Sequence, residues 1–321
     1  MEMLPTVAYY LYWRYWKVRK QIDSIKKSNI PFYPSAETDK PKLDVYLPTR
    51  ISTLAPVIFF IYGGSWSSGN KLMYTLLADT LRKEGYMVVV PDYRKYPEVK
   101  IAQIYEDVTQ ALLWTRDNAK HYGGDPSCIS IMGHSAGAHL AAQMVLDDIR
   151  RKVEMQTSTA DTTALPPVQH LILLAGVYDI GEHYLWETYR GVEEISGMSR
   201  VMGSTPANFD LNSPTCALKS VLSWDLKKKG EFVRQLPPTL VVHGQHDYTV
   251  PVQSANKFHT VLQEIFHDIN QHVEYKYLCY PDMNHSDPVF ALMPTCWYHS
   301  QFYKPLLDEI SNYSNKPSRE N

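Results

Sequence analysis

The chain has 321 residues, of which 44% are hydrophobic and 21% are charged, which is enough for one large domain with a sizeable core. Its 32 Lys and Arg residues nearly balance its 34 Asp and Glu residues, for a net charge of -2. This balance gives no overall indication of nucleic-acid binding, and we expect no nucleic-acid partner. Four widely spaced cysteines and no recognisable secretory signal lead us to expect an intracellular protein with free thiols.

The N-terminal segment is amphipathic. From Pro5 to Lys27 apolar residues recur at helical spacing and basic residues occupy the other faces. Tyr and Trp, which favour membrane interfaces, are frequent there, and the apolar stretch before Arg14 is too short to cross a bilayer. We expect residues 1–30 to form a helix. Through residues 5–27 it would lie on a membrane surface, or it would pack on its own domain or on a second subunit.

Residues 31–321 are predicted to form a single domain in which strands alternate with helices. Strands are expected at 43–47, 56–62, 87–90, 128–131, 168–175, 239–242 and 273–280. Helices are expected at 72–81, 101–119, 252–266 and 297–310, and directly after the strand at 128–131. Alternation of this kind favours a parallel sheet with helices on both faces.

A long segment separates the strands at 168–175 and 239–242. It is rich in aromatic residues and is too long and too apolar for a plain loop. We therefore expect residues at about 178–236 to form a cap over the functional site.

A serine lies where the strand at 128–131 runs into its helix. The residues Gly133-His134-Ser135-Ala136-Gly137 have the form G-x-S-x-G, in which small residues allow a sharp turn beside the serine. The sequence predicts that Ser135 is a nucleophile, exposed at the carboxyl end of a strand and above a helix N-terminus.

Two later strand ends supply a base and an acid. A serine hydroxyl needs a base to take its proton and an acid to orient that base, and in folds with this motif the order is serine, acid, histidine. Asp247 follows the strand at 239–242, and His285 follows the strand at 273–280. We expect Asp247 to orient His285, and His285 to activate the serine.

Other carboxylates near strand ends are weaker candidates for the acid. Asp179 also follows a strand and remains an alternative. Asp282 and Asp287 flank His285 too closely in the sequence for strand-end geometry.

Other histidines are also close to these motifs. His243 and His246 form an H-x-x-H pattern, but no third ligand accompanies them at metal-binding spacing. No metal site is therefore predicted. His134 and His139 are expected to pack in the interior or to form turns.

Attack on a carbonyl also requires donors for the resulting oxyanion. The pair Gly63-Gly64 ends an apolar strand at the place where this kind of fold supplies such a loop. We expect the backbone N–H groups of Gly64, Ser65 and Ala136 to form the oxyanion hole.

Six motifs together resemble the α/β-hydrolase carboxylesterases, in particular the branch that is similar to isoprenylcysteine methylesterases and kynurenine formamidases. They are Y-G-G-S-W at 62–66, D-Y-R at 92–94, Y-G-G-D-P at 122–126, G-H-S-A-G-A-H at 133–139, H-G-Q-H-D at 243–247 and N-H at 284–285. The resemblance covers most of residues 43–295. One departure is Tyr62, because many esterases and formamidases have a histidine before the Gly-Gly pair.

The resemblance implies an α/β-hydrolase fold, with a mostly parallel central sheet, helices on both faces and a cap insertion after the sixth strand. It implies a serine esterase that uses no cofactor and no metal. Its substrate would be a prenylcysteine methyl ester, as a small molecule or on a prenylated protein. We expect such an enzyme in the cytoplasm or on the cytoplasmic face of the endoplasmic reticulum membrane. The alternatives are an N-formylkynurenine formamidase, a general short-chain carboxylesterase and, more distantly, a non-catalytic binding protein of the same fold.

Overall fold

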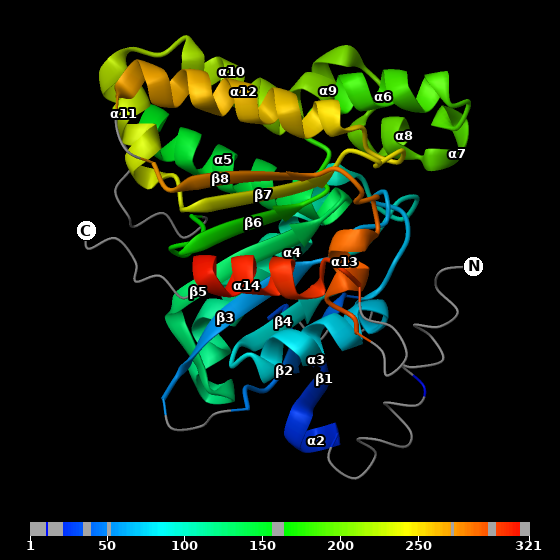
Figure 1. Cartoon of the computed structure of the whole chain (residues 1–321), viewed down its shortest axis with the longest axis vertical. Coiled ribbons are helices and arrows are strands. Elements are labelled where there is room, and N and C mark those ends of the chain that lie inside the picture. Colours follow the sequence, from blue (N-terminus) through cyan, green and yellow to red (C-terminus); the bar gives the residue numbers. More distant parts are fainter. Residues whose placement is uncertain are drawn as a thin grey trace.

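The structure is a computed structural model that describes residues 11, 22–34, 40–49, 53–155, 164–270, 273–294 and 300–314. Its centre is an eight-stranded sheet in the order β1-β2-β4-β3-β5-β6-β7-β8 (Figure 1). The strands are β1 (Lys26–Pro31), β2 (Lys42–Tyr46), β3 (Ala55–Ile61), β4 (Met87–Pro91), β5 (Gly124–His134), β6 (His170–Leu174), β7 (Thr239–Gly244) and β8 (Tyr275–Tyr280). β1 and β2 run antiparallel, and all pairs from β4 to β8 are parallel.

The inner strands are apolar on both sides because helices cover both faces of the sheet. β4 and β6 are buried along their whole length, as their continuous apolar sequences predict. Parallel strands also end at a common edge, so the loops after β3, β5, β7 and β8 meet there.

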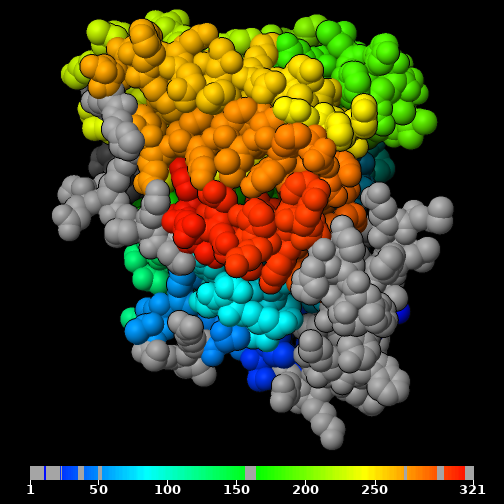
Figure 2. Space-filling view, viewed as in Figure 1, coloured from blue at the N-terminus to red at the C-terminus, as the bar shows by residue number. Residues whose placement is uncertain are grey.

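α3 (Thr75–Lys83) and α14 (Tyr303–Ser314) lie on one face, and α5 (Ala136–Met155) lies with other helices on the opposite face (Figure 1). Figure 2 shows α14, in red, lying across the first face beside α3, in cyan. The helices outside the segment between β6 and β7 are α2 (Ile22–Ile25), α3 (Thr75–Lys83), α4 (Ile101–Asn118), α5 (Ala136–Met155), α12 (Val252–Ile269), α13 (Asp287–Ala291) and α14 (Tyr303–Ser314), with 3-10 turns η2 (Lys71–Tyr74) and η3 (Ala119–Tyr122).

The segment between β6 and β7 is helical throughout. It contains α6 (Ile180–Tyr189), α7 (Glu193–Ser196), α8 (Met198–Met202), α9 (Pro206–Leu211), α10 (Pro214–Leu222) and α11 (Leu226–Gln235). Its two halves differ. α10 and α11 pack against α5 and α12, where Val221 and Phe232 are fully buried. α6 contacts α7 and α9, and α8 contacts the same two helices. A cap formed by residues at about 178–236 stays a prediction.

The structure corrects the carboxyl end of the predicted N-terminal helix. α2 ends at Ile25, and residues 26–30 belong to β1, which pairs with β2. These residues are a strand because Ile25 is buried in the core and Lys26 reaches the fully buried Asp44 across 2.7 Å. Neither contact can be inferred from periodicity in one segment.

Most of the predicted membrane-binding face, in residues 1–10 and 12–21, lies outside the described residues. Among the helices that the structure describes, none has the length and the apolar character needed to cross a bilayer.

Candidate active site

Ser135 occupies a strained turn between β5 and α5. Its φ is +54°, a left-handed conformation that residues with a side chain rarely adopt. A Cβ atom at Gly133 would lie 2.4 Å from the Gly137 carbonyl oxygen, and one at Gly137 would lie 2.0 Å from the Ile61 carbonyl oxygen. Both positions therefore require glycine. The Ser135 N–H donates to the Leu174 carbonyl in β6 at 2.9 Å, which fixes the turn to the sheet.

The structure brings the predicted serine, histidine and aspartate into one hydrogen-bonded line. Ser135 Oγ lies 2.9 Å from His285 Nε2, and His285 Nδ1 lies 2.7 Å from Asp247 Oδ2. The three residues follow β5, β8 and β7, respectively. With Nδ1 donating to the carboxylate, Nε2 is left to accept the proton of the serine hydroxyl.

Asp247 is buried and accepts several hydrogen bonds. Its Oδ1 accepts the N–H groups of Thr249 (2.9 Å) and Val250 (2.7 Å). His243 Nε2 lies 3.4 Å from Oδ2 and 2.9 Å from the Val250 carbonyl oxygen. Burial raises the pKa of Asp247, but hydrogen bonds from His243 and His285 outweigh it and lower the pKa well below its usual range. The carboxylate therefore stays charged.

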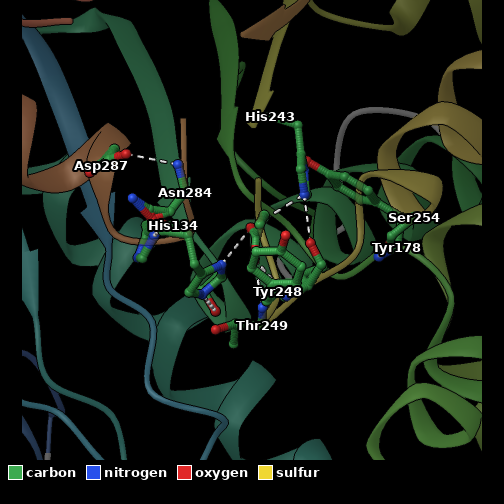
Figure 3. A network of polar contacts seen from close by, with 12 residues as sticks. His134, Tyr178, His243, Tyr248, Thr249, Ser254, Asn284 and Asp287 are labelled. Atoms are coloured by element: carbon green, nitrogen blue, oxygen red, sulfur yellow. Dashed lines mark hydrogen bonds and ion pairs between the residues drawn. The ribbon is translucent and has the colours of Figure 1, made fainter. Parts of the chain in front are cut away.

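Two further contacts hold the loop that carries His285. His134 Nε2 donates to the His285 backbone carbonyl at 2.9 Å. Burial, with a smaller effect of nearby His285, lowers the pKa of His134 to about 3, so its ring is neutral. The Asn284 N–H donates to the Asp287 side chain at 2.7 Å (Figure 3). A Cβ atom at Gly244 would meet the Met283 carbonyl oxygen at 1.9 Å, so this glycine lets the loops after β7 and β8 touch.

The loop after β3 has an unusual backbone. Gly64, Ser65 and Trp66 have φ values of +137°, +50° and +57°, which store strain in two residues that carry side chains. The Trp66 indole N–H donates to His139 Nδ1 at 3.2 Å, and His139 Nε2 donates to the Asn212 carbonyl at 2.7 Å. Through the buried His139 this loop is tied to α5 and to the end of α9.

This loop leaves donors free next to the serine. A Cβ atom at Gly63 would lie 2.7 Å from the Ser135 Cβ, so the two backbones are in contact. The described residues accept no hydrogen bond from the N–H groups of Gly64, Ser65 and Ala136. These N–H groups are therefore available to an anion.

Tyr62, which replaces the more common histidine, is anchored below this loop. Its hydroxyl donates to Asp92 Oδ1 at 2.8 Å, and Asp92 also accepts the backbone N–H and the ammonium group of Lys71. The Tyr62 ring stacks on Tyr93, at 4.8 Å, and on Tyr74, at 5.4 Å. Aromatic packing and one carboxylate thus hold the strand end from which the loop starts.

The alternative acids have other partners. Asp179 caps α6 by accepting the Glu182 N–H at 3.1 Å and pairs with Lys257 at 3.1 Å. Asp282 is exposed, and Asp287 accepts the Asn284 N–H. The described hydrogen bonds connect none of these carboxylates to a histidine.

Sequence reasoning missed the contribution of three residues. The H-x-x-H spacing suggests His243 only as a metal ligand, and the sequence indicates no contact of His134 or Tyr62 with the site. For His243 a signal existed, because it ends the same strand that leads to Asp247 four residues later. His246 is exposed, and the described residues contain no group of three His, Cys, Asp or Glu side chains that could hold a metal.

Comparison with known proteins places the chain in a family. The family model BD-FAE matches residues 43–262. The chain belongs to the BD-FAE family. This BD-FAE protein is similar to isoprenylcysteine alpha-carbonyl methylesterase ICME of Arabidopsis thaliana, with 29% identity over 229 residues that make up 71% of this chain and 51% of that protein. It is also similar to esterase LipQ of Mycobacterium tuberculosis, with 29% identity over 74% of this chain and 52% of that protein. The chain spans about half the length of these curated relatives.

Solved structures confirm the predicted fold of this BD-FAE protein. Esterase B from Lactobacillus rhamnosis superposes with a TM-score of 0.66 at 19% identity, over 90% of this chain and 84% of that one. A truncated carbohydrate esterase from gut microbiota superposes with a TM-score of 0.63 at 22% identity, over 91% of this chain and 96% of that one. The mostly parallel sheet with helices on both faces is therefore an α/β-hydrolase fold.

Proposed function

We propose that this chain is a serine carboxylesterase that works through an acyl-enzyme. The observation that carries the proposal is the line of hydrogen bonds from Asp247 through His285 to Ser135, with unused backbone N–H groups beside the serine. The similarity to proteins named as esterases and methylesterases supports it.

The geometry supports the following sequence of steps. Ser135 Oγ attacks the ester carbonyl carbon while His285 Nε2 takes the hydroxyl proton. The N–H groups of Gly64, Ser65 and Ala136 stabilise the negative charge on the carbonyl oxygen. The carbon–oxygen bond to the alcohol then breaks, and His285 returns the proton to the departing oxygen. Water attacks the acyl-enzyme in the same way and releases the acid and free Ser135.

Asp247 contributes through His285. Its charged carboxylate holds the proton on Nδ1, which fixes the imidazole tautomer, and it stabilises the imidazolium that forms when the serine is deprotonated. Its other oxygen is held by two backbone N–H groups, so the carboxylate keeps one orientation.

For the substrate we favour a prenylcysteine methyl ester, as a small molecule or at the end of a prenylated protein, which would release methanol. Its support is the similarity to the methylesterase of Arabidopsis thaliana. Such a substrate agrees with peripheral attachment to a membrane through residues 5–27. We place the protein in the cytoplasm or at the cytoplasmic face of the endoplasmic reticulum membrane. Liposome sedimentation with and without residues 1–21, a deletion that leaves Ile25 in the core and Lys26 paired with Asp44, tests the attachment, and equal partitioning would refute it.

The test of the function compares three substrates with one control. Purified protein is assayed with farnesylcysteine methyl ester, p-nitrophenyl acetate and N-formylkynurenine, and Ser135→Ala is assayed beside it. We expect the prenyl ester to have the highest kcat/KM and Ser135→Ala to lower kcat by about 10⁴-fold or more.

Each other outcome has a clear meaning. Preference for N-formylkynurenine would identify a formamidase, and cleavage of the short ester alone would identify a general carboxylesterase. An active Ser135→Ala variant would refute the proposed mechanism. If the wild type hydrolysed none of the three substrates, the interpretation as a non-catalytic binding protein would be favoured.

A further inference from the structure

A cavity of about 560 Å³ opens between α6 and the segment that leads from β7 into α12. Leu185, Trp186 and Tyr189 line it from α6, and Tyr248, Pro251 and Val252 line it from the other side. The Trp186 indole N–H donates to the Tyr248 carbonyl at 3.2 Å, which joins the two walls. The volume is in the range of about 300–1,000 Å³ that small-molecule sites occupy.

Large apolar side chains at the mouth of the cavity are in contact with water. Leu185, Tyr189 and Tyr248 are 67%, 82% and 73% exposed. Exposed apolar residues that gather around a hollow are typical of binding sites. The rings of Trp186 and Tyr189 stack at 5.6 Å, so two aromatic side chains of this rim support each other.

The charges in the walls are compensated. Asp179 and Glu182 both pair with Lys257. His183, which also lines the cavity, is buried, and burial lowers its pKa to about 4, so it is neutral near pH 7. Gln245, Gln253 and Ser254 add neutral polar groups to the lining. A cavity with a mainly apolar surface and paired charges suits an uncharged, largely apolar ligand better than an ion.

The cavity adjoins the proposed catalytic residues. Asp247 forms part of its wall, and the carboxylate of Asp247 is hydrogen-bonded to His285, which is hydrogen-bonded to Ser135. The Asp247 side chain is itself fully buried, and neither His285 nor Ser135 lines the cavity, so the Asp247 carboxylate and the His285 imidazole both lie between the cavity and the serine hydroxyl. A flexible chain attached to a carbonyl at Ser135 would have to extend past His285 to enter the cavity.

We propose that this cavity binds the apolar alkyl or isoprenoid chain of the ester substrate. The proposal rests on the proposed esterase function and gives it a specificity site. The chain can belong to the acid or to the alcohol of the ester, and the two sources are separated by the choice of substrates.

The first test compares two exposed leucines of the helical insertion. Leu185→Gln changes the rim, and Leu226→Gln changes a leucine that is 65% exposed on α11, outside the cavity. Each variant and the wild type are assayed with p-nitrophenyl acetate, p-nitrophenyl decanoate and decyl acetate. We expect Leu185→Gln to lower the kcat/KM for a long ester relative to p-nitrophenyl acetate by about fivefold, and Leu226→Gln to leave that ratio unchanged.

The ester whose relative kcat/KM falls in Leu185→Gln identifies the source of the chain. A fall for p-nitrophenyl decanoate means that the chain belongs to the acid, and a fall for decyl acetate means that it belongs to the alcohol. Equal ratios for both variants with both long esters would overturn the proposal.

A binding measurement keeps the test independent of catalysis. Calorimetric titration with 1-decanol, which is neither charged nor cleavable, should give a Kd about fivefold weaker for Leu185→Gln than for Leu226→Gln. The same Kd for both variants, or no binding to the wild type, would refute the cavity as a chain site. Binding without hydrolysis of any ester would instead refute the proposed function alone.

Discussion

At the scale of single residues, the backbone of Ser135 determines where its hydroxyl points. The residue keeps a φ of +54° because its neighbours leave no room for another backbone conformation of the turn. The close contacts at Gly133 and Gly137 show this crowding. A side chain held this way needs no reorientation when substrate arrives, and such preorganisation lowers the barrier of the reaction.

The first prediction concerns the choice between two acids. Asp247→Asn should lower kcat for ester hydrolysis by about 10⁴-fold, because an amide no longer stabilises the imidazolium or fixes the tautomer of His285. Asp179→Asn is the matched control, since asparagine still caps α6. Because Asp179 also lines the proposed chain-binding cavity, both variants are assayed with p-nitrophenyl acetate, which has no long chain. With this substrate Asp179→Asn should change kcat less than about threefold, although the ion pair with Lys257 is lost.

Steady-state kinetics on both variants show which carboxylate orients His285. Thermal unfolding verifies that each variant is folded. A larger loss of kcat for Asp179→Asn than for Asp247→Asn would show that the acid is misassigned.

Sequence reasoning reached the three residues of the proposed catalytic line because each follows a strand, and parallel strands end at one edge. It did not reach His134, His243 or the anchor of Tyr62 on Asp92. Those contacts depend on side chains that meet across loops, and their geometry appears only when the strands are in register.

At the scale of elements, β1 adds a buried ion pair to the edge of the sheet. Lys26 and Asp44 are 2.7 Å apart, with side chains 5% and 0% exposed. The Asn29 N–H also donates to Asp44 at 2.8 Å, and Lys71 lies 3.9 Å away. Two elements that are distant in the sequence, β1 and the turn η2, thus share one buried carboxylate.

The second prediction follows from that carboxylate. Lys26→Met should lower the free energy of unfolding by about 3 kcal/mol, because Asp44 remains buried with its main counter-charge removed. Lys27→Met changes the neighbouring, exposed lysine of the same strand and should change stability by less than about 0.5 kcal/mol.

Urea unfolding of the two variants measures the difference. Equal stabilities would mean that Lys71 and the Asn29 N–H suffice to compensate Asp44.

The elements that were predicted well are those whose sequence carries its own signal. β3 and β4 are continuous apolar runs, and α4 and α12 have one apolar face. β1 carries no such signal, since Lys26 and Lys27 interrupt it and its partner β2 lies across a loop. The packing of α10 and α11 on α5 and α12 likewise could not be predicted from the sequence, because an apolar helix face does not identify the element that it packs against.

At the scale of the whole molecule, three buried histidines link stability to pH. Burial is the main cause that lowers the pKa of His134 to about 3 and of His139 and His183 to about 4, from 6.5. The unfolded chain binds protons at these sites below about pH 6.5, whereas the folded chain does not until about pH 4. Their contribution to stability is therefore complete above pH 6.5 and decreases as the pH falls toward 4.

The third prediction is that the free energy of unfolding falls as the pH is lowered from 7 to 4.5, as urea titrations at several pH values would measure. His183→Gln should make this dependence shallower by removing one of the three groups. His121→Gln, at an exposed histidine, should not change it. Parallel curves for the two variants would contradict the assignment of the effect to buried histidines.

The cavity beside Asp247 also bears on turnover. If it holds the apolar chain before the ester bond is cut, the same walls hold that chain afterwards, because the fragment that carries it keeps every apolar contact. Longer chains should then be captured more efficiently and released more slowly. Selectivity for them would be visible in kcat/KM, whereas kcat would be limited by departure of the product.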